Sequence, residues 1–161
     1  MNSSTRQTMP LGVAIAAAVV VMASFMPWVT LSQLLPFGNM FPGSLPMNVS
    51  LPSPTAWNSN VTLLGITIPN WFLVGIAAVA AFSAWTTAAG RWSAPRWLIL
   101  GLPIYGVCHS AFVIFMIMTS NGIGLGFGVI LTFLAFGGML ATVVRTTVIQ
   151  STSLLTAQEP V

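Results

Sequence analysis

Charged residues are almost absent from this chain. Its 161 residues include four arginines and one glutamate but neither lysine nor aspartate, so charged residues make up 3% of the total. A soluble domain carries about a quarter charged residues, because its surface faces water. Hydrophobic residues make up 56% of the chain. We therefore predict an integral membrane protein.

The residues that carry most protein chemistry are equally scarce. One cysteine cannot form an internal disulfide, and one histidine beside one glutamate supplies no set of metal ligands. Four dispersed arginines form no basic patch, which argues against nucleic acid as a partner. We expect no catalytic residue, no metal site and no cofactor, and hence no enzymatic activity.

Four apolar runs are each long enough for a helix that crosses a membrane, which needs roughly 20 residues. They predict an all-α integral membrane protein, a four-transmembrane-helix bundle in one domain over residues 1–161. The predicted helices cover residues 11–31, 71–89, 97–118 and 125–148, followed by a cytoplasmic tail at 149–161. A signal peptide cleaved after Ala23 is the alternative for the first run, but the apolar residues continue to Val29.

The arginines predict the orientation. If the helices alternate in direction, all four arginines lie on one side of the membrane, and the positive-inside rule makes that side cytoplasmic. These residues are Arg6, Arg91, Arg96 and Arg145. Both termini are then cytoplasmic, and Trp28 and Trp71 are expected at the outer lipid interface, where indole rings are favoured. Arginine without lysine suggests a bacterial source, and therefore the bacterial cytoplasmic (plasma) membrane.

The predicted outer loop, residues 32–70, contains no charged residue. Residues 47–51 alternate apolar and polar side chains, and residues 61–68 are rich in β-branched side chains, so the two segments could pair as a β-hairpin. A loop without charge that carries Leu, Met, Phe and Trp is expected to lie on the helices, on lipid or against another protein.

The only tyrosine, cysteine and histidine of the chain, Tyr105, Cys108 and His109, lie together in the third predicted helix. Tyr105 and His109 are four residues apart and share one face of that helix. Cys108 points aside and is expected to act as a small buried hydrophobic residue.

Two interpretations of His109 differ in their chemistry. It could bind a haem or a metal ion, although no second histidine and no membrane carboxylate would support that site. Alternatively, it is a neutral imidazole that hydrogen-bonds a helix carbonyl, Ser110, Thr132 or a partner subunit. The second interpretation is favoured, because one histidine cannot form such a site alone.

Glycines cluster at the start of the fourth predicted helix and recur within it. Small residues four positions apart let helix backbones approach closely, so the cluster predicts tight helix–helix contacts rather than a phosphate-binding loop. The glycines concerned are Gly122, Gly124, Gly126, Gly128, Gly137 and Gly138.

The overall plan resembles the broad class of tetraspan membrane proteins, although the outer cysteines of claudin-like proteins are missing. The segment Met26-Pro27-Trp28-Val29-Thr30 is similar to a Pro-Trp turn found in small bacterial membrane proteins. We expect a non-catalytic accessory or assembly subunit whose partners are the lipid bilayer and other membrane subunits. The alternatives are a redox or haem subunit that uses His109, and a small channel or transporter for a neutral substrate.

Overall fold

The protein is mostly helical. The computed structural model describes residues 3–30, 53–63, 66–92, 94–120 and 124–156. Four helices account for most of these residues: α1 (Ser3–Ser24), α2 (Phe72–Ala88), α3 (Arg96–Thr119) and α4 (Phe127–Thr156). Four short strands accompany them: β1 (Val29–Thr30), β2 (Asn60–Leu63), β3 (Ile66–Pro69) and β4 (Gly124–Leu125).

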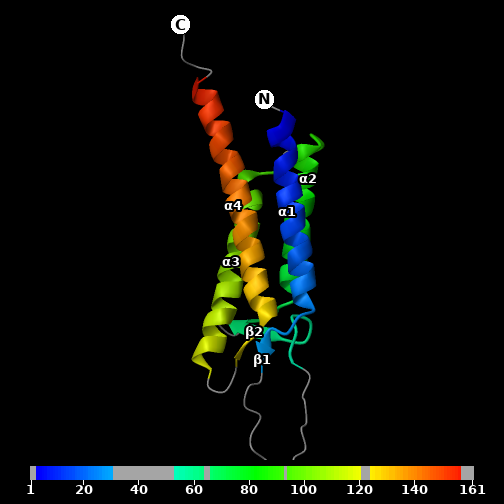
Figure 1. Ribbon diagram of the computed structural model, residues 1–161, viewed down its shortest axis with the longest axis vertical. Coiled ribbons are helices and arrows are strands. Elements are labelled where there is room, and N and C mark those ends of the chain that lie inside the picture. Colours follow the sequence, from blue (N-terminus) through cyan, green and yellow to red (C-terminus); the bar gives the residue numbers. More distant parts are fainter. Residues whose placement is uncertain (1–2, 31–52, 64–65, 93, 121–123, 157–161) are drawn as a thin grey trace, which may run out of the picture.

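The four helices pack side by side. Helix α1 contacts α2 and α4, and α3 contacts the same two helices. Helix α1 begins and α4 ends at one end of the molecule, whereas the strands gather at the opposite end, called here the strand end (Figure 1). Among the described residues, two helical segments are long and apolar enough to cross a membrane: α3 and residues Phe127–Val148 of α4. The apolar parts of α1 and α2, Met9–Ser24 and Phe72–Ala88, are shorter.

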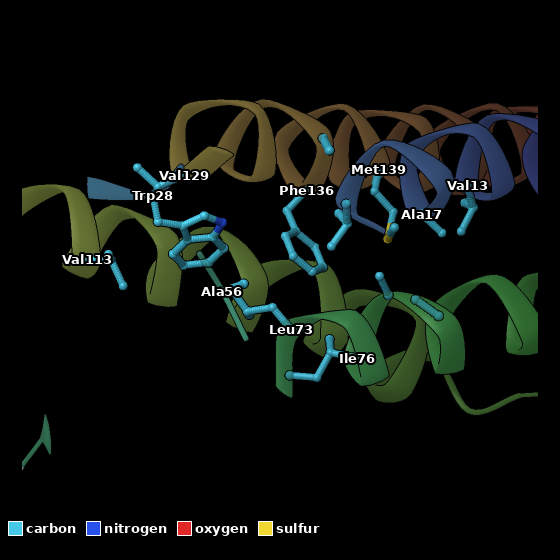
Figure 2. Packing of buried hydrophobic residues seen from close by; sticks show 14 of the residues in the cluster. Val13, Ala17, Trp28, Ala56, Leu73, Ile76, Val113, Val129, Phe136 and Met139 are labelled. Carbon is cyan, nitrogen blue, oxygen red and sulfur yellow. The ribbon is translucent and has the colours of Figure 1, made fainter. Parts of the chain in front are cut away.

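The core between the helices combines one large ring with many small residues. Phe136 points from α4 into the space between the helices, toward Leu73 of α2 (Figure 2). Its ring lies directly against Gly106 of α3, so that a Cβ atom at Gly106 would overlap it. A Cβ atom at Gly12 of α1 would lie 2.9 Å from Cγ2 of Thr142 on α4. At these two glycines, which were not among the residues predicted to pack, α3 and α1 each come close to α4.

Helix α1 ends at Ser24 rather than at residue 31, because the chain turns before Pro27. Proline has no N–H group, and it disfavours helical geometry in the residue before it. The indole Nε1–H of Trp28 donates at 3.1 Å to the carbonyl of Ala23 at the helix end, which also accepts from the Met26 N–H at 3.2 Å. Trp28 is 1% exposed. The Trp28 ring is therefore enclosed by its own chain, and the predicted place of Trp28 at the outer lipid interface stays a prediction.

The start of α4 is fixed against this turn. Strands β1 and β4 pair antiparallel, with Val29 opposite Leu125. The Gly126 N–H donates to the Trp28 carbonyl at 3.0 Å, and the Gly128 N–H to the Pro27 carbonyl at 2.9 Å. Helix α4 thus begins at Phe127 instead of residue 125. It continues to Thr156, past the predicted end at 148, and no glycine or proline interrupts it after Gly138.

Strands β2 and β3 form an antiparallel pair in which Asn60 lies opposite Pro69 and Leu63 opposite Ile66. The segment predicted as a single strand, residues 61–68, therefore contains most of two strands that pair with each other. Two residues, 64 and 65, join them, which is a common hairpin connection. The predicted partner segment 47–51 lies outside the described residues.

Candidate functional site

The imidazole of His109 binds a side chain of its own chain. Its Nε2 atom lies 3.1 Å from Oδ1 of Asn70, which directly follows β3 and precedes α2 by two residues. Its Nδ1 atom lies 3.5 Å from the hydroxyl oxygen of Tyr105, one helical turn earlier on α3. The two rings are 5.7 Å apart between centroids. The predicted pairing of Tyr105 with His109 on one helix face is confirmed by these contacts.

The partners predicted for His109 within this chain are wrong. The Ser110 hydroxyl donates to the Gly106 carbonyl at 2.6 Å, and the Thr132 hydroxyl to the Gly128 carbonyl at 2.8 Å. Both hydroxyls are therefore bonded within their own helices. A residue 39 positions away, Asn70, meets His109 instead.

Asn70 connects α3 to the segment that precedes the β2–β3 hairpin. Its side chain is 2% exposed, and its Nδ2 atom donates to the Ser59 hydroxyl at 2.9 Å. The Asn70 backbone N–H donates to the Ser59 carbonyl at 3.1 Å, and the Ser59 hydroxyl donates to the Thr55 carbonyl at 2.6 Å. The hydrogen bonds therefore form a continuous chain, which runs from Tyr105 through His109, Asn70 and Ser59 to Thr55.

The donors and acceptors of this chain run in one direction. The Ser59 hydroxyl has a single hydrogen, which it donates to the Thr55 carbonyl, so it must accept from Asn70. The amide nitrogen of Asn70 therefore faces Ser59, and its oxygen faces His109. That oxygen requires a hydrogen on Nε2, which in a neutral imidazole leaves Nδ1 to accept from the Tyr105 hydroxyl.

This arrangement occupies both ring nitrogens of His109. A metal ion or haem iron binds a lone pair of a ring nitrogen, and the free lone pair on Nδ1 accepts the Tyr105 hydrogen bond. In the part of the chain that the structure describes, no three His, Cys, Asp or Glu residues lie close enough together to hold a metal ion. The geometry is that of a structural polar contact between α3 and the segment before α2.

A cleft lies beside Asn70, with a volume of about 190 Å³, and we call it the Asn70 cleft. One wall is α3, with Val113, Met116 and Ile117, and the other is strand β2. Trp28 and Val29 also line it, as do Ser59 and Asn70 from the polar chain. This cleft was not expected from the sequence, because it depends on how the hairpin meets the last turns of α3.

The glycines of α4 divide into two groups. A Cβ atom at Gly126 would overlap the backbone of Pro27 and Trp28 in the turn after α1, whereas a Cβ atom at Gly128 would overlap the Trp28 side chain and the carbonyl of Ala23 in α1. Gly128 therefore has the close contact with a second helix that was predicted for it, whereas Gly126 contacts the turn. At Gly137 and Gly138, a Cβ atom would meet nothing within 4 Å. Gly124 lies in β4, and Gly122 is outside the described residues.

The remaining predicted residues lie on the surface. Trp71 is exposed beside the start of α2. Arg91 lies between α2 and α3, with its guanidinium 5.8 Å from the centre of the Trp85 ring, a cation–π distance. Arg96 and Arg145 are exposed. Cys108 is exposed on α3, which corrects the buried position expected for it.

Comparison with known proteins gives no relative to this chain: no family model, no curated protein and no solved structure matches it.

Proposed function

We propose that this chain is a membrane protein with four spanning helices, in which α1 begins and α4 ends on the cytoplasmic side. Two helical segments have the length and apolarity for spanning, and the apolar parts of α1 and α2 pack alongside them. All four arginines belong to the half of the molecule opposite the strand end: Arg6 is in α1, Arg91 in the α2–α3 connection, Arg96 at the first residue of α3 and Arg145 in the second half of α4. This charge distribution supports the proposed orientation by the positive-inside rule.

We infer that the protein is a non-catalytic accessory or assembly subunit of a larger membrane complex, in the bacterial cytoplasmic membrane. The observation that carries this proposal is the outward surface of α4 around Gly137, Gly138 and Ala141. Glycine within a helix costs about 1 kcal/mol relative to alanine. No neighbour within the described residues requires either glycine, because a Cβ atom at each position has open space.

The spacing of these small residues fits a partner helix. Gly137 and Ala141 are four residues apart, and such a pair lets a second helix approach the backbone closely, with the open position Gly138 next to it. Gly101 on α3 also faces open space, but the residue four positions later is Tyr105, which would keep a partner helix away. The α4 surface therefore fits close helix contact better than the α3 surface does.

Native mass spectrometry after mild detergent extraction tests the proposal. We expect the wild-type chain to retain a partner subunit and Gly138→Leu to lose it, because the leucine would occupy the space of the partner helix. Gly101→Leu is the matched control, with the same added side chain at another open position. It should retain the partner.

Neither variant should unfold at a lower temperature than the wild type, since a Cβ atom at each position meets no neighbour within 4 Å and leucine favours the helix more than glycine does. Extraction of the wild type as a lone monomer would contradict the role as a subunit. Retention of the partner by Gly138→Leu would contradict the assignment of the α4 surface.

A further inference from the structure

The Asn70 cleft has the size of a site for a small molecule. Its volume of about 190 Å³ exceeds the roughly 150 Å³ of an engineered apolar cavity that accepts benzene in another protein. A ligand with about six carbon atoms therefore fits, whereas a whole lipid does not. The helices and hairpin that form its walls are already in place in the free chain.

The walls of the cleft are apolar along most of their length. Val113, Met116 and Ile117 line it from α3, and Val61 faces them from β2. All eleven lining residues are uncharged. A carboxylate or ammonium group would lose its hydration there without meeting an opposite charge, which is unfavourable. The cleft thus selects against charged ligands.

Polar residues also line the cleft, namely Ser59, Asn60, Thr62, Asn70 and Ser120. Among them, the Asn70 amide has hydrogen-bonding capacity left on both of its polar atoms. The Asn70 amide nitrogen uses one hydrogen for Ser59, and its oxygen uses one lone pair for His109. An amide has two hydrogens and two lone pairs, so the group can bind one further donor or acceptor on each atom. The existing bonds to Ser59 and His109 hold the amide in one orientation. The remaining hydrogen on Nδ2 and the remaining lone pair on Oδ1 therefore each point in a fixed direction.

We propose that the Asn70 cleft binds a small uncharged amphiphile, with an alkyl portion of about six carbons against α3 and β2 and a hydroxyl group at Asn70. This activity is separate from the proposed subunit role, because the cleft is at the strand end and the α4 glycines are not part of its lining. A ligand in the cleft would join the hairpin to the last turns of α3.

Photolabelling of the intact protein in detergent micelles tests this proposal, with a hexanol that carries a diazirine as the probe. We expect labelled peptides from both walls, residues 59–62 and 113–117. Hexanol should compete with the probe, whereas hexanoate, which has the same chain length and a negative charge, should not. Labelling spread along all helices, or equal competition by both compounds, would overturn the proposal.

Two methionines of α3 provide matched variants. Met116 lines the cleft and is 44% exposed, whereas Met118 is 75% exposed and is not part of the lining. Met116→Trp should reduce labelling of both walls about tenfold, the effect of losing the burial of about two methylene groups. Met118→Trp should label as the wild type does. Equal labelling of the two variants would also overturn the proposal, and their unfolding temperatures check that both are folded.

Discussion

The strand end and the helical half of this molecule are held together by different interactions. At the strand end, side chains and backbone groups form directed hydrogen bonds, from Trp28 to Ala23 and from His109 through Asn70 to Ser59. In the helical half, hydroxyl groups bond back to their own helices, as in Ser83, Thr142 and Thr146. There the contacts between helices are close packing of apolar and small side chains.

This difference affects how each region specifies its structure. A hydrogen bond between distant segments needs one partner in one direction, so it fixes how the loops meet the helices. Close packing needs shape and volume, and related apolar residues can supply these. We therefore expect substitutions of equal size to have larger effects at the strand end than on the outward surfaces of the helices. Three pairs of variants test this expectation.

The largest difference is expected between two glycine-to-alanine substitutions. A Cβ atom at Gly126 would overlap the carbonyl of Pro27, a backbone group that cannot move aside as a side chain can. Gly126→Ala should lower the free energy of unfolding by about 3 kcal/mol or more. Gly137→Ala, at an open helix position, should raise it by up to about 1 kcal/mol. Chemical denaturation in detergent measures both, and a stable Gly126→Ala would show that the turn adjusts freely.

An intermediate effect is expected for tryptophan. Trp28→Phe keeps an aromatic ring but removes the indole N–H, which leaves the carbonyl of Ala23 without that bond at a buried position. We expect a loss of about 2 kcal/mol. The same substitution at Trp85, which is 53% exposed, should change stability by less than about 0.5 kcal/mol. Equal losses at the two positions, measured by thermal unfolding, would contradict the capping role of Trp28.

The smallest expected effect is the coupling free energy between Asn70 and His109. In a double-mutant cycle with Asn70→Leu and His109→Phe, we expect a coupling free energy of about 1 kcal/mol, because each substitution alone breaks the same bond. A cycle of Asn70→Leu with Cys108→Ala is the control, since Cys108 is next to His109 in the sequence but lies on the exposed surface of α3, away from the buried Asn70. That cycle should be additive within about 0.5 kcal/mol. A coupling free energy below about 0.5 kcal/mol in the first cycle would show that the bond between Asn70 and His109 does not stabilise the fold.

Helix positions were predictable from the sequence, and helix ends were not. The apolar runs locate the four helices, because a long run without charge has few other stable structures. Trp28 shows why the ends differ. As an apolar residue it extends the first run, yet its indole caps the helix that ends before it. This role depends on Pro27 and on the carbonyl of Ala23, and hydrophobicity alone does not contain that information.

Of the contacts of His109, the one with Tyr105 was predictable from the sequence and the one with Asn70 was not. The spacing of four residues between Tyr105 and His109 places them on one helix face, and this pairing needs no tertiary structure. The contact with Asn70 could not be predicted in this way. It depends on which turn of α3 lies beside the start of α2, and this is a feature of the tertiary structure. In the sequence, His109 lies near the middle of the third predicted helix, so its expected partners within the chain, Ser110 and Thr132, were also helix residues.

The unequal lengths of the neighbouring helices have a consequence for the surrounding lipid. Helix α2 has 17 residues and α3 has 24; at 1.5 Å per residue these are about 26 Å and 36 Å long, against a hydrocarbon layer of about 30 Å. In the proposed membrane orientation, the bilayer must therefore become thinner beside α2 than beside α3. Such a one-sided hydrophobic mismatch would favour thin bilayers, and it would bring lipid headgroups toward the level of Asn70.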